Sequence, residues 1–369
     1  MMREGWEYKK LGELCTSISD GSHNPPKGID HSLYRMISSQ NVFDDNLQIT
    51  EDNVRYITES DHLCENKRTK LQKDVVLLTI VGTIGRSCVL KGNEGCLTLQ
   101  RSVAALHPSD QIMPRYLMHC LIGNRHTLNQ EAHGIAQKGI YLKQLSSLSI
   151  PLPPKSTQLA IVSELDKINE LIRLKKEQLK DFDNLAQSLF YEMFGDPVEN
   201  EMGWEVKKLG EVYKMKSGDS LSTKSFEEGD IPVYGGNGIS GYHNQYNKDG
   251  SYIIIGRVGV YCGNVRIVKG RFWLTDNAFE LLYDNSSQNE VFVCSLLTHL
   301  NLRQYANAAA QPVISNNTLK HVSIPLPPLP LQQLFAHRIE QIEHQKAEVQ
   351  KSITDLETLL ASRMQYWFE

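Results

Sequence analysis

The sequence lacks any long hydrophobic run. Apolar stretches such as Val75–Val81 (VVLLTIV) and Tyr252–Ile255 (YIII) fall far short of the ~20 residues that a membrane-spanning helix needs. The first ten residues, Met1–Lys10, hold no apolar core of the kind that a signal peptide requires. These absences predict a protein without a membrane partner.

The sequence also lacks the usual spacings of metal and nucleotide sites. Its 7 cysteines are scattered and no two of them form a C-x-x-C pair, which indicates reduced thiols in a cytoplasmic protein. Histidines such as His31, His62 and His243 show no metal-ligand spacing. No G-x-x-x-x-G-K-S/T motif is present, so ATP hydrolysis by a P-loop is unsupported. We expect no metal and no cofactor bound by this chain.

Two motifs resemble parts of catalytic or cofactor sites but lack the neighbouring residues that such sites need. Asn24–Lys27 (NPPK) resembles the start of the loop with which DNA amino-methyltransferases stack an aromatic ring on a flipped base, but Lys27 stands in place of the ring. Gly236–Gly241 fits G-x-G-x-x-G, yet the polar Tyr242–Gly250 follows it where a dinucleotide site needs a helix. We interpret the first as a proline-rich turn and the second as a glycine-rich loop between strands.

An excess of basic charge is missing too. The net charge is −4, which argues mildly against a nucleic-acid partner. The acidic excess is concentrated in residues 151–202 and 325–369, and the rest of the chain is near neutral. A local basic patch can still bind DNA there. With 40% hydrophobic and 22% charged residues, the chain is expected to be folded.

What the sequence does contain is an internal repeat. Trp6–Glu13 (WEYKKLGE) recurs 198 positions later as Trp204–Glu211 (WEVKKLGE), and Ile150–Pro154 (IPLPP) recurs 174 positions later as Ile324–Pro328. The second offset also maps Gly82 and Gly85 to Gly256 and Gly259, Ala136-Gln137 to Ala310-Gln311, and Gln158 to Gln332. The first copy therefore carries 24 extra residues, between Trp6 and Val81. A repeat of this length predicts two related domains.

Each copy has the same order of elements. β-rich segments come first and an apolar helix follows, before a Gly/Ala/Gln loop and the IPLPP exit. We expect strands within Val75–Ile80, Leu97–Leu106, Tyr252–Ile255 and Phe279–Tyr283, and helices at Tyr116–Ile122 and Val291–Leu300.

A helix of about 40 residues follows each IPLPP, spanning roughly 60 Å. Its apolar residues fall on the a and d positions of a heptad, and such a narrow seam favours pairing with another helix. The seam comprises Leu165, Ile168, Ile172, Leu179, Phe182, Ala186, Leu189 and Met193 in the first helix, and Ile339, Ile342, Val349, Ile353, Leu356, Leu360 and Trp367 in the second. Lys175, Lys346 and Arg363 are charged exceptions. The alternative is two amphipathic helices, each packed only on its own domain.

These patterns predict an α+β protein. Two similar β-rich domains are each followed by a long helix, and the helices pair as an antiparallel coiled coil with pseudo-two-fold symmetry. The predicted parts are a first domain at 1–153, a helix at 154–195, a linker at 196–202, a second domain at 203–327 and a helix at 328–369.

This arrangement resembles the specificity subunit of type I restriction–modification systems. The resemblance rests on the order of several motifs, found in both halves and covering essentially the whole chain. They are Thr79–Arg86 (TIVGTIGR), Leu99–Leu106 (LQRSVAAL), Ala136–Leu142 (AQKGIYL) and Ile150–Pro154 in the first half, and Ile231–Gly241 (IPVYGGNGISG) and Ile253–Asn264 (IIIGRVGVYCGN) in the second.

The resemblance implies a division of labour. Each target-recognition domain would read one half of a split sequence in double-stranded DNA, and the paired helices would set the distance between the halves. Two modification subunits would dock on the helical region and carry the methyltransferase chemistry, and a restriction and motor subunit would join them. S-adenosylmethionine, ATP and Mg²⁺ would belong to those partners, and this chain would have no catalytic residues.

Candidate DNA readers follow from base chemistry, because Arg and Lys pair with guanine, and Asn and Gln with adenine. In the first domain they are Ser38, Ser39, Gln40, Asn41, Arg86, Arg101, Gln137 and Lys138. In the second they are Tyr234, Asn237, Tyr242, His243, Asn244, Arg257, Asn264, Asn277 and Gln311. Ser38–Asn41 and Gly235–Gly238 lie 197 positions apart, which indicates the same loop in both copies. The recurring Ala-Gln pairs suit a shared structural or phosphate-positioning role.

Two other functions stay open at this stage. A self-contained adenine methyltransferase with a fused reader would need a cofactor domain, and the repeat already occupies both halves. A coiled-coil scaffold with two β-rich modules for a partner other than DNA would show the same periodicities.

Overall fold

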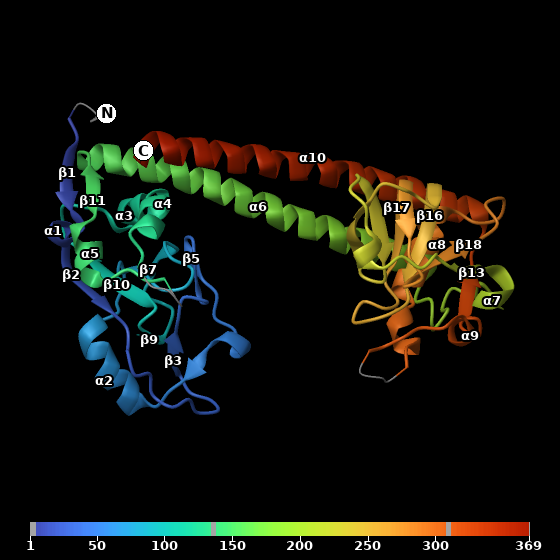
Figure 1. Cartoon of the computed structure of the whole chain (residues 1–369), viewed down its shortest axis with the longest axis horizontal. Coiled ribbons are helices and arrows are strands. Elements are labelled where there is room, and N and C mark those ends of the chain that lie inside the picture. The colour runs from blue at the N-terminus through green and yellow to red at the C-terminus, as the bar shows by residue number, and fades with distance from the viewer. Residues whose placement is uncertain (1–4, 134–137, 308–310, 369) are drawn as a thin grey trace. The chain divides into compact units, whose positions relative to one another are not determined.

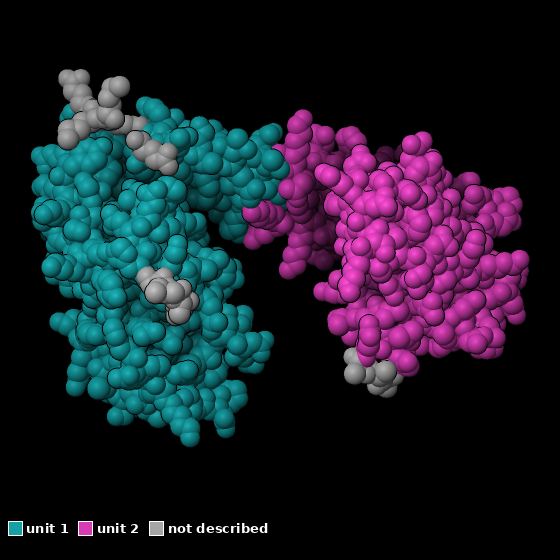
Figure 2. Space-filling model, in the orientation of Figure 1, with its two compact units in different colours: residues 1–175, 352–369 teal, residues 176–351 magenta. Residues whose placement is uncertain are grey.

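The computed structural model describes residues 5–133, 138–307 and 311–368 (Figure 1). The chain packs into two compact units (Figure 2): unit 1 consists of residues 1–175 and 352–369, and unit 2 of residues 176–351. Both long helices are present, as α6 (Lys155–Phe194) and α10 (Leu329–Phe368). Each helix contributes one part to each unit. The domain boundaries drawn from the sequence stay predictions, because the units follow packing rather than chain order.

Unit 1 is built on a four-stranded sheet in the order β2-β10-β7-β8, beside a three-stranded sheet in the order β6-β3-β9. β1 pairs with β11, and β4 with β5. The strands are β1 (Glu7–Lys10), β2 (Cys15–Asp20), β3 (Tyr34–Ile37), β4 (Val42–Phe43), β5 (Asn46–Leu47), β6 (Arg55–Tyr56), β7 (Val76–Thr79), β8 (Ser87–Val89), β9 (Cys96–Leu99), β10 (Val103–Pro108) and β11 (Ser149–Leu152). The helices are α1 (Leu11–Leu14), η1 (Glu51–Asn53), α2 (Glu59–Thr69), α3 (Pro114–Gly123), α4 (Arg125–Gln130) and α5 (Leu142–Ser147).

Unit 2 is built on one six-stranded sheet in the order β13-β18-β16-β17-β14-β15, and β12 pairs with β19. The strands are β12 (Glu205–Lys208), β13 (Lys214–Ser217), β14 (Ile231–Gly235), β15 (Gly238–His243), β16 (Lys248–Gly256), β17 (Val265–Leu274), β18 (Ala278–Leu282) and β19 (Ser323–Leu326). The helices are α7 (Leu209–Val212), η2 (Thr223–Ser225), α8 (Glu290–His299), η3 (Leu302–Tyr305) and α9 (Asn316–Leu319).

The two units share one topology, which confirms the predicted pair of related domains. The order β2-β10-β7-β8 in unit 1 matches β13-β18-β16-β17 in unit 2, and the pairing of β1 with β11 matches that of β12 with β19. In addition, β3 runs parallel to β9, just as β14 runs parallel to β17. The predicted helices at Tyr116–Ile122 and Val291–Leu300 correspond to α3 and α8.

The structure corrects the residue mapping between the copies. Val103 pairs with Thr79 across β10 and β7, and Ala278 pairs with Gly256 across β18 and β16. Thr79 is therefore the counterpart of Gly256. Gly82 then corresponds to Gly259, and Gly85 to Gly263, whereas the constant offset of 174 placed these two glycines three or four residues too early. The reason is that the two copies differ in length at several places, so no single offset holds across the repeat.

Most of the extra length of the first copy lies in one place. Ile37 and Thr79 are 42 positions apart, whereas their counterparts Tyr234 and Gly256 are 22 apart. This difference accounts for 20 of the 24 extra residues. The insert holds β4, β5, β6 and helix α2, which caps its N-terminus with the Thr58 side chain.

The β-rich segment expected at Leu97–Leu106 contains two strands, β9 and β10. They join different sheets, and the chain turns between them at residues 100–102. The amide of Val103 donates to the carbonyl of Gln100 at 3.0 Å, which closes this turn. The polar residues Gln100–Ser102 form this turn, between the two apolar runs.

The long helices lie antiparallel where they meet within each unit. In unit 1, the guanidinium of Arg363 forms an ion pair with Glu164, and the indole of Trp367 donates to the same carboxylate at 3.0 Å. In unit 2, Lys346 pairs with Asp183 at 2.8 Å. Residue numbers rise along one helix as they fall along the other. Lys346 and Arg363, the charged exceptions in the seam, therefore each have a carboxylate opposite them.

The seam positions are shielded from solvent. Each predicted seam residue from Leu165 to Leu360 is buried or half-buried. Leu165 and Leu360 belong to the core of unit 1, and Phe182 and Ile342 belong to the core of unit 2. Because each unit contains parts of both helices, the alternative of a helix packed only on its own domain is wrong.

One buried glutamine fixes the start of each long helix, Gln158 for α6 and Gln332 for α10. Gln158 donates to the carbonyls of Gln111 and Pro153, at 3.1 and 3.0 Å, and accepts from the Met113 amide at 2.9 Å. Gln332 donates to Pro327 at 2.8 Å and accepts from the Asn289 amide at 2.9 Å. Their recurrence in the sequence is thus explained by structure: each ties the proline-rich exit to the loop before α3 or α8.

Replacing Gln158 with alanine is expected to destabilise unit 1 by roughly 1–3 kcal/mol, because the half-buried Met113 amide loses its acceptor. Hydrogen exchange measured in the full chain should show lower protection in α3 and in the start of α6, with unit 2 unchanged. Gln341→Ala removes an exposed glutamine from α10 and serves as the control. Equal protection in the two variants would contradict this role.

Candidate nucleic-acid interface

In each unit, two parallel strands end side by side and place their following loops together. Ile37 lies opposite Leu99 in the pair β3 and β9, and Tyr234 lies opposite Leu274 in the pair β14 and β17. The amide of Gln100, just after β9, donates to the carbonyl of Ile37 at 2.9 Å, and the amide of Thr275, just after β17, donates to that of Tyr234 at 2.9 Å. The structure thus confirms that Ser38–Asn41 and Gly235–Gly238 are the same loop.

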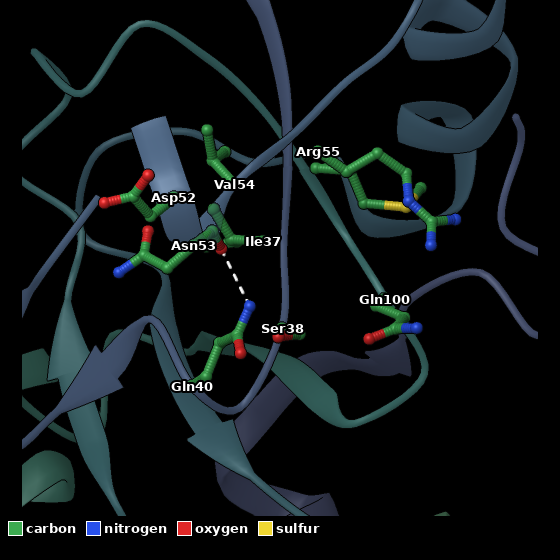
Figure 3. Close-up of a pocket in the computed structure, with 9 residues that line it drawn as sticks. Ile37, Ser38, Gln40, Asp52, Asn53, Val54, Arg55 and Gln100 are labelled. Carbon is green, nitrogen blue, oxygen red and sulfur yellow. Dashed lines mark hydrogen bonds between the residues drawn. The ribbon is translucent and has the colours of Figure 1, made fainter. Parts of the chain in front are cut away.

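At this point unit 1 has a pocket, which we call the unit-1 hollow (Figure 3). Its polar lining includes Ser38, Gln40, Arg55 and Gln100. The side-chain amide of Gln40 donates to the Asn53 carbonyl at 2.8 Å, which holds this exposed side chain across the hollow (Figure 3). Asp52 also lines the hollow (Figure 3), so the lining presents amide, guanidinium and carboxylate groups, which suit hydrogen bonding to base edges.

The unit-2 hollow lies at the equivalent point of unit 2. It brings together three predicted readers from distant segments, Asn237, Asn277 and Gln311. All three are exposed. Ser240 and Thr275 also line it. Gly235, Asn237 and Thr275 stand where unit 1 has Ser38, Gln40 and Gln100.

Glycines allow the backbone to approach closely at the unit-2 hollow. A Cβ on Gly256 would lie 2.3 Å from the Gly236 carbonyl oxygen, so a larger residue does not fit there. Gly238 has φ +106°, which disfavours other residues. Gly236-Asn237 forms the two-residue turn between β14 and β15. The predicted loop between strands is therefore only Gly236-Asn237, because Gly238–Gly241 belongs to β15, and the tip of this hairpin carries Asn237.

Two predicted readers point inward instead. Asn41 is fully buried: its side chain accepts from the Ser38 amide at 2.8 Å and donates to Asn53, which shapes the loop. His243 is 4% exposed, and its Nδ1 accepts from the Glu227 amide at 3.0 Å. Both side chains are used within the fold, so we no longer assign them to base contacts.

Three further candidates are held by internal contacts. The Arg86 guanidinium lies over the Phe43 ring, and Tyr234 packs edge-on against Phe272. Arg257 donates to Ser217 at 3.1 Å and covers the Phe279 ring.

The remaining candidates divide by exposure. Ser39 is half-buried, and its amide donates to Ser102 at 3.0 Å. Asn244 is exposed but donates to Glu227 at 2.7 Å. The candidates that are exposed outside the two hollows are Arg101, Lys138, Tyr242 and Asn264. Gln137 lies outside the described residues, as do Ala136 and Ala310. Contacts of all these residues with DNA stay predictions.

The sequence did not single out Arg55, Gln100, Ser240 or Thr275, which also line the hollows. Gln100 and Thr275 follow equivalent strands, but they are different residue types, so the sequence alone does not reveal that they are equivalent. Only the strand register links them.

Within the described residues, no group of three or more His, Cys, Asp or Glu side chains has the arrangement of a metal site. No helix among the described residues has the length and apolar character needed to cross a membrane. The 7 cysteines are free thiols. Burial raises the pKa of the Cys15 thiol to about 12, so this group is uncharged at neutral pH.

Comparison with known proteins identifies the family. The type I restriction modification DNA specificity domain matches residues 3–181 and again residues 201–358. These two segments make up most of the chain and fall one on each half of the repeat. The chain therefore belongs to the family of type I restriction–modification specificity subunits.

Individual relatives agree with this assignment. The EcoprrI specificity subunit of Escherichia coli is 32% identical over 169 residues, which are 44% of this chain and 41% of that subunit. The putative MjaX specificity subunit of Methanocaldococcus jannaschii is 23% identical over 377 residues, covering 92% of this chain and 87% of the relative.

Solved structures show the same fold. The S subunit from M. genitalium superposes with a TM-score of 0.58 at 17% identity, over 98% of this chain and 95% of that one. A chain from a study of complex assembly and conformational transition of the type I R-M system gives 0.61 at 18% identity, over 100% and 99%.

Proposed function

We propose that this chain recognises a bipartite sequence in double-stranded DNA, with unit 1 reading one half and unit 2 the other. It directs methylation and cleavage by partner subunits and makes or breaks no bond itself. Two modification subunits carry the methyltransferase and bind S-adenosylmethionine, and restriction subunits use ATP and Mg²⁺. This chain binds none of these cofactors.

One observation carries the proposal. The same strand ends form a polar hollow in each unit, but the lining differs, with Gln40 and Gln100 in unit 1 and Asn237 and Thr275 in unit 2. A shared frame with different hydrogen-bonding groups is what a reader of two different half-sites requires, since base identity is read by the pattern of donors and acceptors.

The two rival functions are less well supported. A fused methyltransferase needs a cofactor domain, but both halves of the chain are occupied by the repeated unit. A scaffold for another partner does not explain why hydrogen-bonding side chains gather at the same strand ends in both units.

Methylome sequencing tests the proposal. Cells that express this chain with its modification subunits should show adenine methylation at a split motif, and cells without this chain should not. Methylation that persists in its absence, or a motif without a gap, would contradict the proposed function.

Point variants should separate the half-sites. Asn237→Ala is expected to relax the preference at one position of one half-site by roughly 5- to 150-fold, because a bidentate amide contact contributes about 1–3 kcal/mol of discrimination. Gln40→Ala should relax only the other half-site. Gln341→Ala, on α10 and away from both hollows, should leave the motif intact. Loss in the same half-site for both variants would be the opposing result.

A further inference from the structure

Unit 2 has a second cavity, the basic hollow, in which the recognition scheme gives a role to Asn264 alone. It is lined by Gly263, Asn264, Val265, Arg266, Thr298, Asn301 and Arg303. Two arginines face it and no acidic residue lines it. Among the described residues, neither Arg266 nor Arg303 is in an ion pair, although Arg303 donates to the Val260 carbonyl at 2.5 Å.

Unit 1 also has an arginine close to this place, Arg125, although the register of α3 and α8 sets Arg125 opposite Asn301 rather than Arg303. Gly85 and Gly263 occupy equivalent places after β7 and β16, with φ +89° and +88°. A Cβ on Gly85 would lie 2.8 Å from the Arg125 side chain, and a Cβ on Gly263 would lie 2.5 Å from the Arg303 backbone. The side chain of Arg125 and the backbone of Arg303 therefore lie against the same glycine of the repeat.

In unit 1 this arginine is neutralised from within the chain. Its guanidinium contacts both carboxylate oxygens of Asp44, at 2.5 and 2.7 Å. The Ser87 amide also points to Asp44, at 3.4 Å. Asp44 lies between β4 and β5, in the insert of the first copy. Unit 2 is 20 residues shorter in this region, so no such carboxylate reaches Arg303.

We propose that the basic hollow binds a backbone phosphate of the DNA at the half-site read by unit 2, with Arg266 and Arg303 as its ligands. Guanidinium groups bind carboxylate and phosphate with the same two-pronged geometry, so a phosphate replaces the carboxylate that unit 1 supplies itself. Phosphate contacts of this kind set the register of a protein on the duplex without reading sequence. The inference rests on the proposed function.

The position of Arg266 links this site to the reader. A Cβ on Gly238 would lie 2.5 Å from Nη1 of Arg266, and Gly238 also lines the unit-2 hollow. A phosphate bound at Arg266 is thus next to the hairpin that carries Asn237. By strand register, Cys88 in unit 1 is the counterpart of Arg266 in unit 2. In unit 1 the carboxylate of Asp44 takes the role that we assign to the phosphate in unit 2. The two units therefore contact the backbone differently.

The test uses the complete complex with its modification subunits and a duplex that contains the methylated motif. Arg303→Ala and Arg266→Ala are each expected to weaken binding roughly 10-fold. Each should also lower the slope of log affinity against log salt by about 0.9, the value for one lost phosphate contact. Arg271→Ala removes an exposed arginine from the same strand as Arg266 and is the matched control.

A further variant tests the site without removing either arginine, so that a loss of binding is not attributed to misfolding of an arginine variant. Thr298 is exposed and lines the basic hollow, so Thr298→Asp places a carboxylate beside the arginines, much as Asp44 does in unit 1. It should lower DNA affinity and the salt slope while the methylated motif stays the same.

Two results would overturn the inference: affinity and salt slope equal to those of Arg271→Ala, or a changed base preference, which would mark the arginines as base readers. Failure of the proposed function would look different, since the unaltered complex would then bind no split motif at all.

Discussion

A chain shortened by one heptad in each long helix is expected to accept a shorter gap between unchanged half-sites. Residues 174–180 of α6 and 348–354 of α10 are the segments to remove. The ion pairs Glu164–Arg363 and Asp183–Lys346 show that facing residue numbers sum to nearly the same value in both units. The two deletions match under this pairing, so the contacts on either side keep their partners.

The size of the change follows from helix geometry. Seven residues rise about 10.5 Å, which corresponds to about three base pairs of B-DNA. A loss of three base pairs also rotates one half-site by roughly 100° around the duplex. We therefore expect the accepted gap to shorten by one to about three base pairs, because the complex has to accommodate both the lost length and this rotation. The recognition loops are untouched, so the bases read in each half-site stay the same.

Methylome sequencing measures the gap directly. The control replaces the same two heptads by other sequences that keep apolar residues at the seam, and it should leave the gap unchanged. Deletion from α6 alone should abolish methylation, because it breaks the match along the seam. An unchanged gap after the double deletion would show that the helices do not set the distance.

The architecture could be predicted from the sequence because it depends on an internal repeat and on the regular spacing of apolar residues. The recurrence of WEYKKLGE and IPLPP marked the β1–β11 and β12–β19 ribbons, and the 3.5-residue spacing marked α6 and α10. Both signals depend on residue type at fixed intervals. The mapping of Gly82 and Gly85 failed where this condition failed, since small insertions shifted the register between the copies.

The candidate site was accessible only in part. Asn237, Asn277 and Gln311 were named as polar loop residues, and the fold gathers them in one hollow. Asn41 and His243 have the same polar character, yet they are buried and bonded to the loops that they organise. Sequence cannot separate these cases, because the direction of a side chain depends on strand register and loop path.

A chain with two copies of its first domain is expected to recognise an inverted repeat. In this variant residues 5–153 replace residues 203–327. Gly5 and Gly203 both have positive φ, at +79° and +69°, so the entry into the domain is the same in both copies. β1 and β11 form the same ribbon as β12 and β19, so both ends of the replacement join at matching points.

The long helices offer the copied domain a suitable surface. In unit 1, Phe368 of α10 packs against Tyr116 and against Gly123, where a Cβ would lie 2.8 Å from its ring. The residue of α6 at the equivalent place is Phe194, which is buried in the core of unit 2. The copied domain therefore finds a phenylalanine where its own core needs one.

Because α6 and α10 are antiparallel where they pair, a domain placed before α10 should meet the duplex in the opposite direction to the same domain placed before α6. The methylated motif should then contain the first half-site and its inverted copy, and the half-site of unit 2 should vanish. Methylome sequencing of cells with the chimera and its modification subunits measures this. Two first half-sites in the same direction would mean that the domains are not related by a two-fold axis, and a motif that keeps the second half-site would mean that residues 203–327 do not read it.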